Sequence, residues 1–172
     1  MAVTINGSAG VTTNSGAVYD SLQRGTAVSA SGTSVDFTSI PSWVRRITVM
    51  YSAVSTNGSS LVQIQIGAGS VTTSGYTWAG NYAGGAGSSA TTGFGIDGGA
   101  SGGAAYIRTG QLVLTLLTSN TWIATNTGTI TANLPTTGSG SIALSGTLDR
   151  VRITTVNGTD TFDAGTINII YE

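Results

Sequence analysis

Apolar and polar residues alternate over residues 43–52 and again over residues 62–66, which is the period expected of half-buried β-strands. Between the two runs, Asn57-Gly58 is a dipeptide that tolerates the positive φ angles of a tight hairpin turn. Pro41 precedes the first run and prevents a helix from continuing into it. The pattern predicts an antiparallel β-hairpin over residues 35–67 with one face in the core.

A similar pattern returns at the C-terminal end. Val and Ile alternate with Arg and Thr over residues 150–155, Asn157-Gly158 follows, and residues 167–171 form a closing apolar run. This region is predicted to be a second hairpin. An internal duplication would explain the similarity, but two hairpins of one sandwich would look the same without any duplication, and we favour the sandwich.

The middle of the chain adds a third predicted hairpin, residues 106–126, with Ser119-Asn120 as its turn. Residues 112–117 are apolar at most positions, which indicates a central strand or one covered by a partner. Residues 134–140 are predicted to form a loop. Residues 35–172 are therefore expected to form an all-β domain, an antiparallel, jelly-roll-like β-sandwich of about eight or nine strands.

Residues 1–34 are polar and rich in glycine, and they have little apolar content to add to a core. Three readings are open for this segment: an extended N-terminal arm that docks the domain to another protein, a frayed terminus, or a strand added to the edge of the sheet. The residues expected to anchor a docking arm are Val3, Ile5, Val18, Tyr19 and Leu22.

The segment 67–105 is too rich in glycine for a helix and too long for an idle connection. Tyr76, Trp78 and Tyr82 would line one side of an extended chain in this segment. Such an aromatic row suits a surface that contacts sugar or protein, because rings offer a large contact area with few rotatable bonds. The other reading is that these rings face the core or a neighbouring subunit, and whether the segment is strand or displayed loop stays open.

Charged residues make up only 8% of the chain, and Lys, His and Cys are absent. The six Arg residues form no basic stripe, so nucleic-acid binding is not expected. Without His or Cys, the commonest general base and the commonest metal ligands are missing. No signal peptide or membrane span is apparent, because no apolar run approaches the roughly 20 residues that a bilayer requires.

Seven acidic residues remain as candidates for chemistry. Asp160 and Asp163 follow the second Asn-Gly pair, where acids more often stabilise turns than act as a catalytic pair. Asp97 lies in a glycine-rich setting but lacks the spacing of a calcium loop. The chain is therefore expected to be no enzyme, with no catalytic residue, no cofactor and no metal.

Four arginines, Arg45, Arg46, Arg150 and Arg152, lie at matching places in the two similar regions. They are expected either to lie at a subunit interface, where they would pair with Asp36, Asp149 or a neighbour's C-terminal carboxylate, or to be solvated. We favour the interface, because a chain with so few charges has few other solubilising groups.

Three runs of the sequence resemble a small β-domain of tailed bacteriophages that occurs in tail-fibre, tail and virion-associated proteins: SVDFTSIPSWVRRITVMYSAVSTNGSS, QLVLTLLTSNTW and SGTLDRVRITTVNGTDTFDAGTINIIYE. The opening VTINGSAGVT also looks like the start of many phage fibre proteins. The resemblance implies a structural virion protein, made in the host bacterial cytoplasm without a signal peptide.

Several expectations follow from that resemblance. The chain would form a homotrimer and would bind other virion proteins of the capsid, portal, tail or fibre. It lacks the shaft of long fibres, so head decoration, a fibre cap and a tail component all stay open. The alternative function is a host-attachment module that binds a surface glycan through Tyr76, Trp78 and Tyr82.

Overall fold

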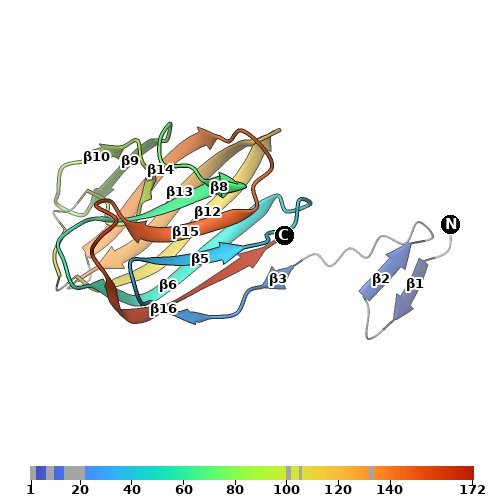
Figure 1. Cartoon of the computed structure of the whole chain (residues 1–172), viewed down its shortest axis with the longest axis horizontal. Helices are drawn as coiled ribbons and strands as arrows, with labels where there is room; N and C mark the ends of the chain where they lie inside the picture. The colour runs from blue at the N-terminus through green and yellow to red at the C-terminus, as the bar shows by residue number, and fades with distance from the viewer. Residues whose placement is uncertain (1–2, 7–9, 14–21, 100–101, 105, 132–133) are drawn as a thin grey trace.

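The computed structural model describes residues 3–6, 10–13, 22–99, 102–104, 106–131 and 134–172. From residue 22 onward they form a β-sandwich in which a nine-stranded and a five-stranded antiparallel sheet lie face to face (Figure 1). The all-β sandwich predicted from the period-two pattern is confirmed. The described strands are more numerous than expected, because segments predicted as loops contain short strands. Within the described ranges, no helix is long and apolar enough to cross a membrane.

The large sheet holds most of the long strands of the molecule. Its strands, in spatial order, are β10 (Ser88–Ala90), β9 (Thr77–Tyr82), β14 (Leu134–Ala143), β13 (Thr121–Ile130), β12 (Arg108–Thr118), β6 (Arg46–Thr56), β16 (Phe162–Tyr171) and β3 (Gln23–Arg24), with β4 (Val28–Ser29) also on β16. Because β12, β6 and β13 each have a neighbour on both sides, their backbone groups are paired along most of their length.

The small sheet covers one face of the large sheet. Its strands, in spatial order, are β11 (Phe94–Gly95), β7 (Val62–Ala68), β15 (Arg150–Thr155) and β5 (Ser34–Thr38), with β8 (Ser70–Val71) also on β7. A separate two-stranded sheet near the N-terminus pairs β1 (Val3–Asn6) with β2 (Gly10–Thr13).

The core lies between the two sheets. Alternate residues of the central strands point inward and are almost completely buried, among them Ile47, Val49, Leu112 and Leu114 from the large sheet and Ile64, Ile66, Val151 and Ile153 from the small sheet. Burial of each such side chain contributes roughly 1.5–3 kcal/mol, which makes this double layer the main source of stability.

The two Asn-Gly regions are not hairpins, and that prediction is wrong. β6 belongs to the large sheet and β7 to the small one, so the connection at Asn57-Gly58 is an arch between sheets. The connection at Asn157-Gly158 likewise crosses from β15 to β16. In each case both strands carry apolar residues on one face, and these faces pack against one another across the core instead of lying in one sheet.

The two arches are joined to each other by hydrogen bonds, and we call them the arch pair (residues 57–60 and 157–161). The Asn57 N–H donates to Thr161 O at 2.9 Å, and the Thr161 N–H donates to Asn57 Oδ1 at 2.8 Å. The Ser60 N–H donates to Asp160 Oδ2 at 2.8 Å, and the Asn157 N–H donates to Ser60 Oγ at 3.0 Å. Segments about 100 residues apart therefore close one end of the sandwich together.

The third predicted hairpin is confirmed, since β12 and β13 pair antiparallel around Ser119-Asn120. β12 also pairs with β6, which gives it the central position that its apolar sequence indicated. The loop predicted over residues 134–140 is wrong, because these residues belong to β14, which pairs with β13 and β9. Gly, Ser and Thr give β14 little apolar pattern, so its partners rather than its sequence define it as a strand.

Residues 23–32 lie along the edge of the large sheet. β3 and β4 pair with β16, Ala30 is buried, and Gly32 bridges Phe162. The last part of the segment expected to be an arm, residues 23–32, is therefore an edge strand. The sandwich begins before residue 34, where its boundary was expected. Of the expected anchor residues, Val18 and Tyr19 lie outside the described residues, Val3 and Ile5 lie in β1, and Leu22 is 59% exposed.

Candidate functional site

The aromatic residues expected at a binding surface lie mostly in the core. Tyr76 and Trp78 are buried and pack edge-on against Phe94, with ring centroids 4.9 and 5.5 Å away. The expectation of a surface or glycan contact is therefore wrong for Tyr76 and Trp78, because these side chains point to the inner face of the sandwich. Tyr82 is half-buried.

The hydroxyl of Tyr76 is tied to the small sheet. It accepts a hydrogen bond from the Ile66 N–H at 2.9 Å and lies 2.9 Å from Thr72 O, to which it donates. Burial raises the pKa of Tyr76 to about 12. The ring and its hydroxyl thus fasten the start of β9 to β7, which is a structural role.

A buried ion pair anchors the glycine-rich segment. The Arg108 Nε and Nη2 atoms donate to the two carboxylate oxygens of Asp97, and Nη1 donates to Tyr106 O at 3.1 Å. Asp97 Oδ2 also accepts the Val62 N–H at 2.8 Å. Since Arg108 lies in β12 and Val62 in β7, Asp97 joins the two sheets through one carboxylate.

A neighbouring buried group is centred on Asn126 of β13. The Tyr51 hydroxyl donates to Asn126 Oδ1 at 2.8 Å, and Asn126 Nδ2 lies 3.4 Å from Ile96 O. Burial, with a smaller contribution from the charge of Asp97, raises the pKa of Tyr51 above its ordinary value. These polar groups satisfy one another inside the core, so they hold the strands in register.

The arginines expected at an interface make ion pairs within the chain. Three pairs are present on the surface: Arg46–Glu172 at 3.3 Å, Arg150–Asp149 at 2.8 Å and Arg152–Asp36 at 2.7 Å. Arg45 instead donates to the backbone carbonyls of Ser42 and Val44. The hydrogen bond from Arg150 holds the pKa of Asp149 below its usual value. Exposed pairs of this kind contribute about 0–1 kcal/mol each, so they mainly fix side-chain positions.

The remaining described carboxylates also have partners. Asp160 accepts hydrogen bonds within the arch pair, which lower its pKa, and Asp163 accepts one from Ser55 Oγ. Among the described residues, no group of three or more His, Cys, Asp or Glu side chains lies together. Asp20 lies outside the described residues.

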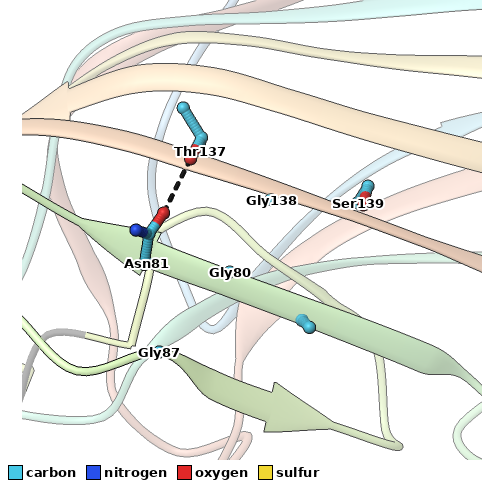
Figure 2. A pocket seen from close by; sticks show the side chains of 7 residues that line it. Gly80, Asn81, Gly87, Thr137, Gly138 and Ser139 are labelled. Atoms are coloured by element: carbon cyan, nitrogen blue, oxygen red, sulfur yellow. Dashed lines mark hydrogen bonds between the residues drawn. The ribbon is translucent and has the colours of Figure 1, made fainter.

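The outer face of the large sheet carries a shallow groove of about 490 Å³ over β9 and β14 (Figure 2). Asn81 and Thr137 point toward one another across the two strands, and Thr137 Oγ1 donates to Asn81 Oδ1 at 2.8 Å. Gly80, Gly87 and Gly138 contribute only backbone to the groove, and a side chain at Gly80 or Gly138 would point inward to Trp78. The groove is therefore flat, uncharged and lined by small groups.

This groove is part of a larger surface, the charge-free face, which consists of the outward-facing side chains of β9, β14, β13 and β12. Those strands contain a single charged residue, Arg108, and it is buried. The surface presents mainly hydroxyl groups, from Thr77, Thr137, Ser139, Ser141, Thr121, Thr125, Thr127, Thr129, Thr109 and Thr115.

At one end of the charge-free face the exposed residues are apolar. Leu117 is 61% exposed and Ile123 is 37% exposed, next to the β12–β13 turn. Arg46 of β6 borders this end, where it pairs with Thr115 in the sheet and with Glu172 by charge. Sequence reasoning missed this face as a unit, although the alternation Thr125, Thr127, Thr129 was a signal for it.

Comparison with known proteins assigns this chain to no family. No protein-family model matches it, and neither does any curated protein or any solved structure. A functional conclusion therefore rests on the sequence pattern and on the geometry of the chain.

Proposed function

We propose that this chain is a non-enzymatic structural protein of a bacteriophage virion, where it forms a homotrimer through the charge-free face. The observation that carries the proposal is the absence of charge from the outer surface of four adjacent described strands, β9, β14, β13 and β12, with Leu117 and Ile123 exposed at one end. Depletion of charged residues is the compositional signal of the centre of a protein interface.

The chemistry of the face suits close contact with a second protein surface. Small side chains allow a second surface to approach the strands, and hydroxyl groups pair with either donors or acceptors across an interface. A surface that stays in water normally carries charges of both signs for solubility, and this face does not. In the proposed trimer, each copy covers the charge-free face of a neighbour.

The described carboxylates support the non-enzymatic part of the proposal. Each of them is engaged by an arginine, by a hydroxyl or by backbone N–H groups in a structural contact. The N-terminal segment is proposed to dock the trimer to other virion proteins of the capsid, portal, tail or fibre. The resemblance of three sequence runs to a tailed-phage domain is the ground for placing the protein in a virion.

The mass of the assembly in solution tests the proposal. The wild-type chain is expected to elute with light-scattering mass equal to three chains, and Leu117→Arg together with Ile123→Arg is expected to give monomers, because each adds an unpaired charge to the interface. Val156→Arg is the matched control, since Val156 is exposed to 50% but lies between β15 and β16.

A monomeric wild-type protein at micromolar concentration would contradict the trimer. A double variant that remains trimeric would contradict the assignment of this face. Incorporation of labelled protein into phage particles tests the virion role separately.

A further inference from the structure

A second groove, of about 310 Å³, lies on the outer face of the small sheet, and we call it the amide groove. Its floor is formed by Gln63 and Gln65 of β7 and by Arg152 and Thr154 of β15. These residues belong to the sheet that packs on the opposite side of the core from the charge-free face. Binding in this groove is therefore separate from assembly through the large sheet.

The four floor residues form a regular array. Arg152 lies directly opposite Gln65 and Thr154 directly opposite Gln63 in the β15–β7 register. Directly opposite residues on one face are about 5 Å apart, and alternate residues along a strand are about 7 Å apart. The array is thus a rectangle comparable in size with a single sugar ring.

The two glutamines are unusual because they face outward from the sheet yet are almost completely covered. Gln63 is 3% exposed and Gln65 is 5% exposed. The chain at Thr92 covers them: Gln65 Nε2 donates to Thr92 O at 2.8 Å, and Thr92 Oγ1 donates to Gln63 Oε1 at 2.9 Å. The Thr92 carbonyl, which can only accept, sets the orientation of the Gln65 amide, and the Thr92 hydroxyl holds the Gln63 amide in place.

Each amide also keeps one polar atom unused. Gln63 Nε2 and Gln65 Oε1 have no hydrogen-bond partner among the described residues, and both glutamines line the groove. Neither atom is fully buried, so both are reached from the groove. The groove thus offers one oriented donor and one oriented acceptor to whatever occupies it.

The charge in the groove is compensated. Arg152 donates from Nε and Nη2 to the two carboxylate oxygens of Asp36, at 2.7 and 2.8 Å, which leaves Nη1 as a further donor. The Thr73 hydroxyl adds a group that both donates and accepts, and the Thr92 hydroxyl, which donates to Gln63, can still accept. This combination matches the vicinal hydroxyl groups of a neutral sugar, each of which donates and accepts, better than it matches an ion or an apolar ligand.

We propose that the amide groove binds one or two neutral sugar residues of an oligosaccharide, with Gln63 Nε2 as donor and Gln65 Oε1 as acceptor to sugar hydroxyls. This site differs from the aromatic row around Trp78, which is buried, and it depends on neither the trimer nor the virion location.

The test is an NMR titration of the whole chain with three neutral trisaccharides. One consists of α-linked glucose, one of β-linked glucose and one of N-acetylglucosamine. Trigalacturonate serves as the acidic comparison. We expect at least one neutral trisaccharide to shift the side-chain amide signals of Gln63 and Gln65, and we expect the shift to saturate at a sugar concentration of about 50 mM. That concentration exceeds the millimolar dissociation constants of weak complexes.

Two variants connect the binding to the amides. Gln63→Met and Gln65→Met keep the length of the side chain but remove the free donor and acceptor, and each is expected to weaken binding about tenfold or more. Gln111→Met is the matched control, because Gln111 is exposed on the charge-free face and its loss should leave the affinity unchanged.

Three results would overturn the proposal. One is the absence of any shift at the Gln63 and Gln65 amides of the wild-type protein with all three neutral probes. Another is trigalacturonate binding at these amides as tightly as the neutral probes, which would indicate selection by the charge of Arg152. The third is unchanged affinity in both folded Met variants. The first two measurements use only the wild-type chain, so they can contradict the proposal even if a variant fails to fold.

Discussion

Arg108 is the largest side chain that is fully buried among the described residues, and Asp97 is its counter-ion. Asp97→Ala is expected to lower the free energy of unfolding by about 3–5 kcal/mol, because it leaves the guanidinium buried without a compensating charge. Urea denaturation measures this difference directly.

The double variant Asp97→Leu with Arg108→Met is the control for that prediction. Removing both charges should restore part of the loss, although the Val62 N–H then lacks its acceptor. A single Asp97→Ala variant whose stability lies within about 1 kcal/mol of wild type would show that the pair is not desolvated as the structure indicates.

Because of Tyr76, we expect the free energy of unfolding to fall in alkaline solution. Burial raises its pKa in the folded state to about 12, from 10.0 in a model peptide, so the unfolded chain ionises first. The contribution of this group is fully present below pH 10 and is lost as the pH rises from 10 toward 12.

Thermal unfolding measured across that alkaline range, with tyrosinate absorbance as a second readout, tests the expectation for Tyr76. The variant Tyr76→Phe should show a shallower alkaline loss than wild type. Equal slopes in the two proteins would mean that other groups, such as Tyr51, account for the dependence.

At the scale of single strands, glycines in β14 make room for the core. A Cβ atom on Gly138 would lie 2.3 Å from Trp78 Cζ2, and the indole is buried and cannot move aside (Figure 2 shows Gly138 in the strand). Gly138→Ala is therefore expected to destabilise the fold by about 1–3 kcal/mol through overpacking.

Gly146→Ala provides the matched control for that substitution. Its Cβ would lie 3.4 Å from Ala68 Cβ, which is ordinary contact, so the change should be neutral or slightly stabilising. Similar denaturation midpoints for the two variants would show that β9 can shift to accept a side chain at position 138.

Because of the arch pair, we expect the fold to lose stability in acid. Hydrogen bonds from the Asn157 side chain and from the Ser60 N–H lower the pKa of Asp160 below its ordinary value of 3.8. Its contribution is therefore present above that value and is lost as the pH falls below it. Asp160→Asn should flatten the acid side of a plot of melting temperature against pH, and an unchanged slope would contradict this assignment.

The sequence predicted these elements unevenly, and the reasons are physical. The β12–β13 hairpin was predicted correctly because its two strands are adjacent along the chain and pair directly. The Asn-Gly regions were mistaken for hairpins because such a dipeptide reverses the chain equally well within a sheet or between sheets. Which of the two occurs depends on where distant strands such as β12 and β15 lie.

The candidate sites show the same limit. Asp36 and Asp149 were named in advance as partners of the arginines, but at a subunit interface, whereas the structure places these ion pairs within one chain. The Asp97–Arg108 pair was missed because a glycine-rich segment without periodicity separates the two residues. The alternation over residues 62–66 correctly placed its polar members, Gln63 and Gln65, on the face away from the core, but only the structure shows that Thr92 covers them.

For the whole molecule, the edge strand at residues 23–32 decides how a truncation behaves. Removing residues 1–21 leaves β3 and β4 in place, so the domain should stay folded and trimeric but fail to join phage particles. Removing residues 1–33 strips one edge from β16 and uncovers the site of Ala30, so a less stable and aggregating product is expected. Circular dichroism melts and particle pull-down measure the two outcomes, and an unfolded product of the shorter deletion would contradict the prediction.

The register of β16 has a practical consequence. Tyr171 pairs with Gln23, whereas Phe162, at the opposite end of β16, lies beside the arch pair about 30 Å away. A linker or fluorophore attached just before Leu22 or just after Glu172 therefore leaves from the same corner. Immobilising the domain at Leu22 or at Glu172 therefore presents the same pole, with Asn57 and Asn157, to the solution.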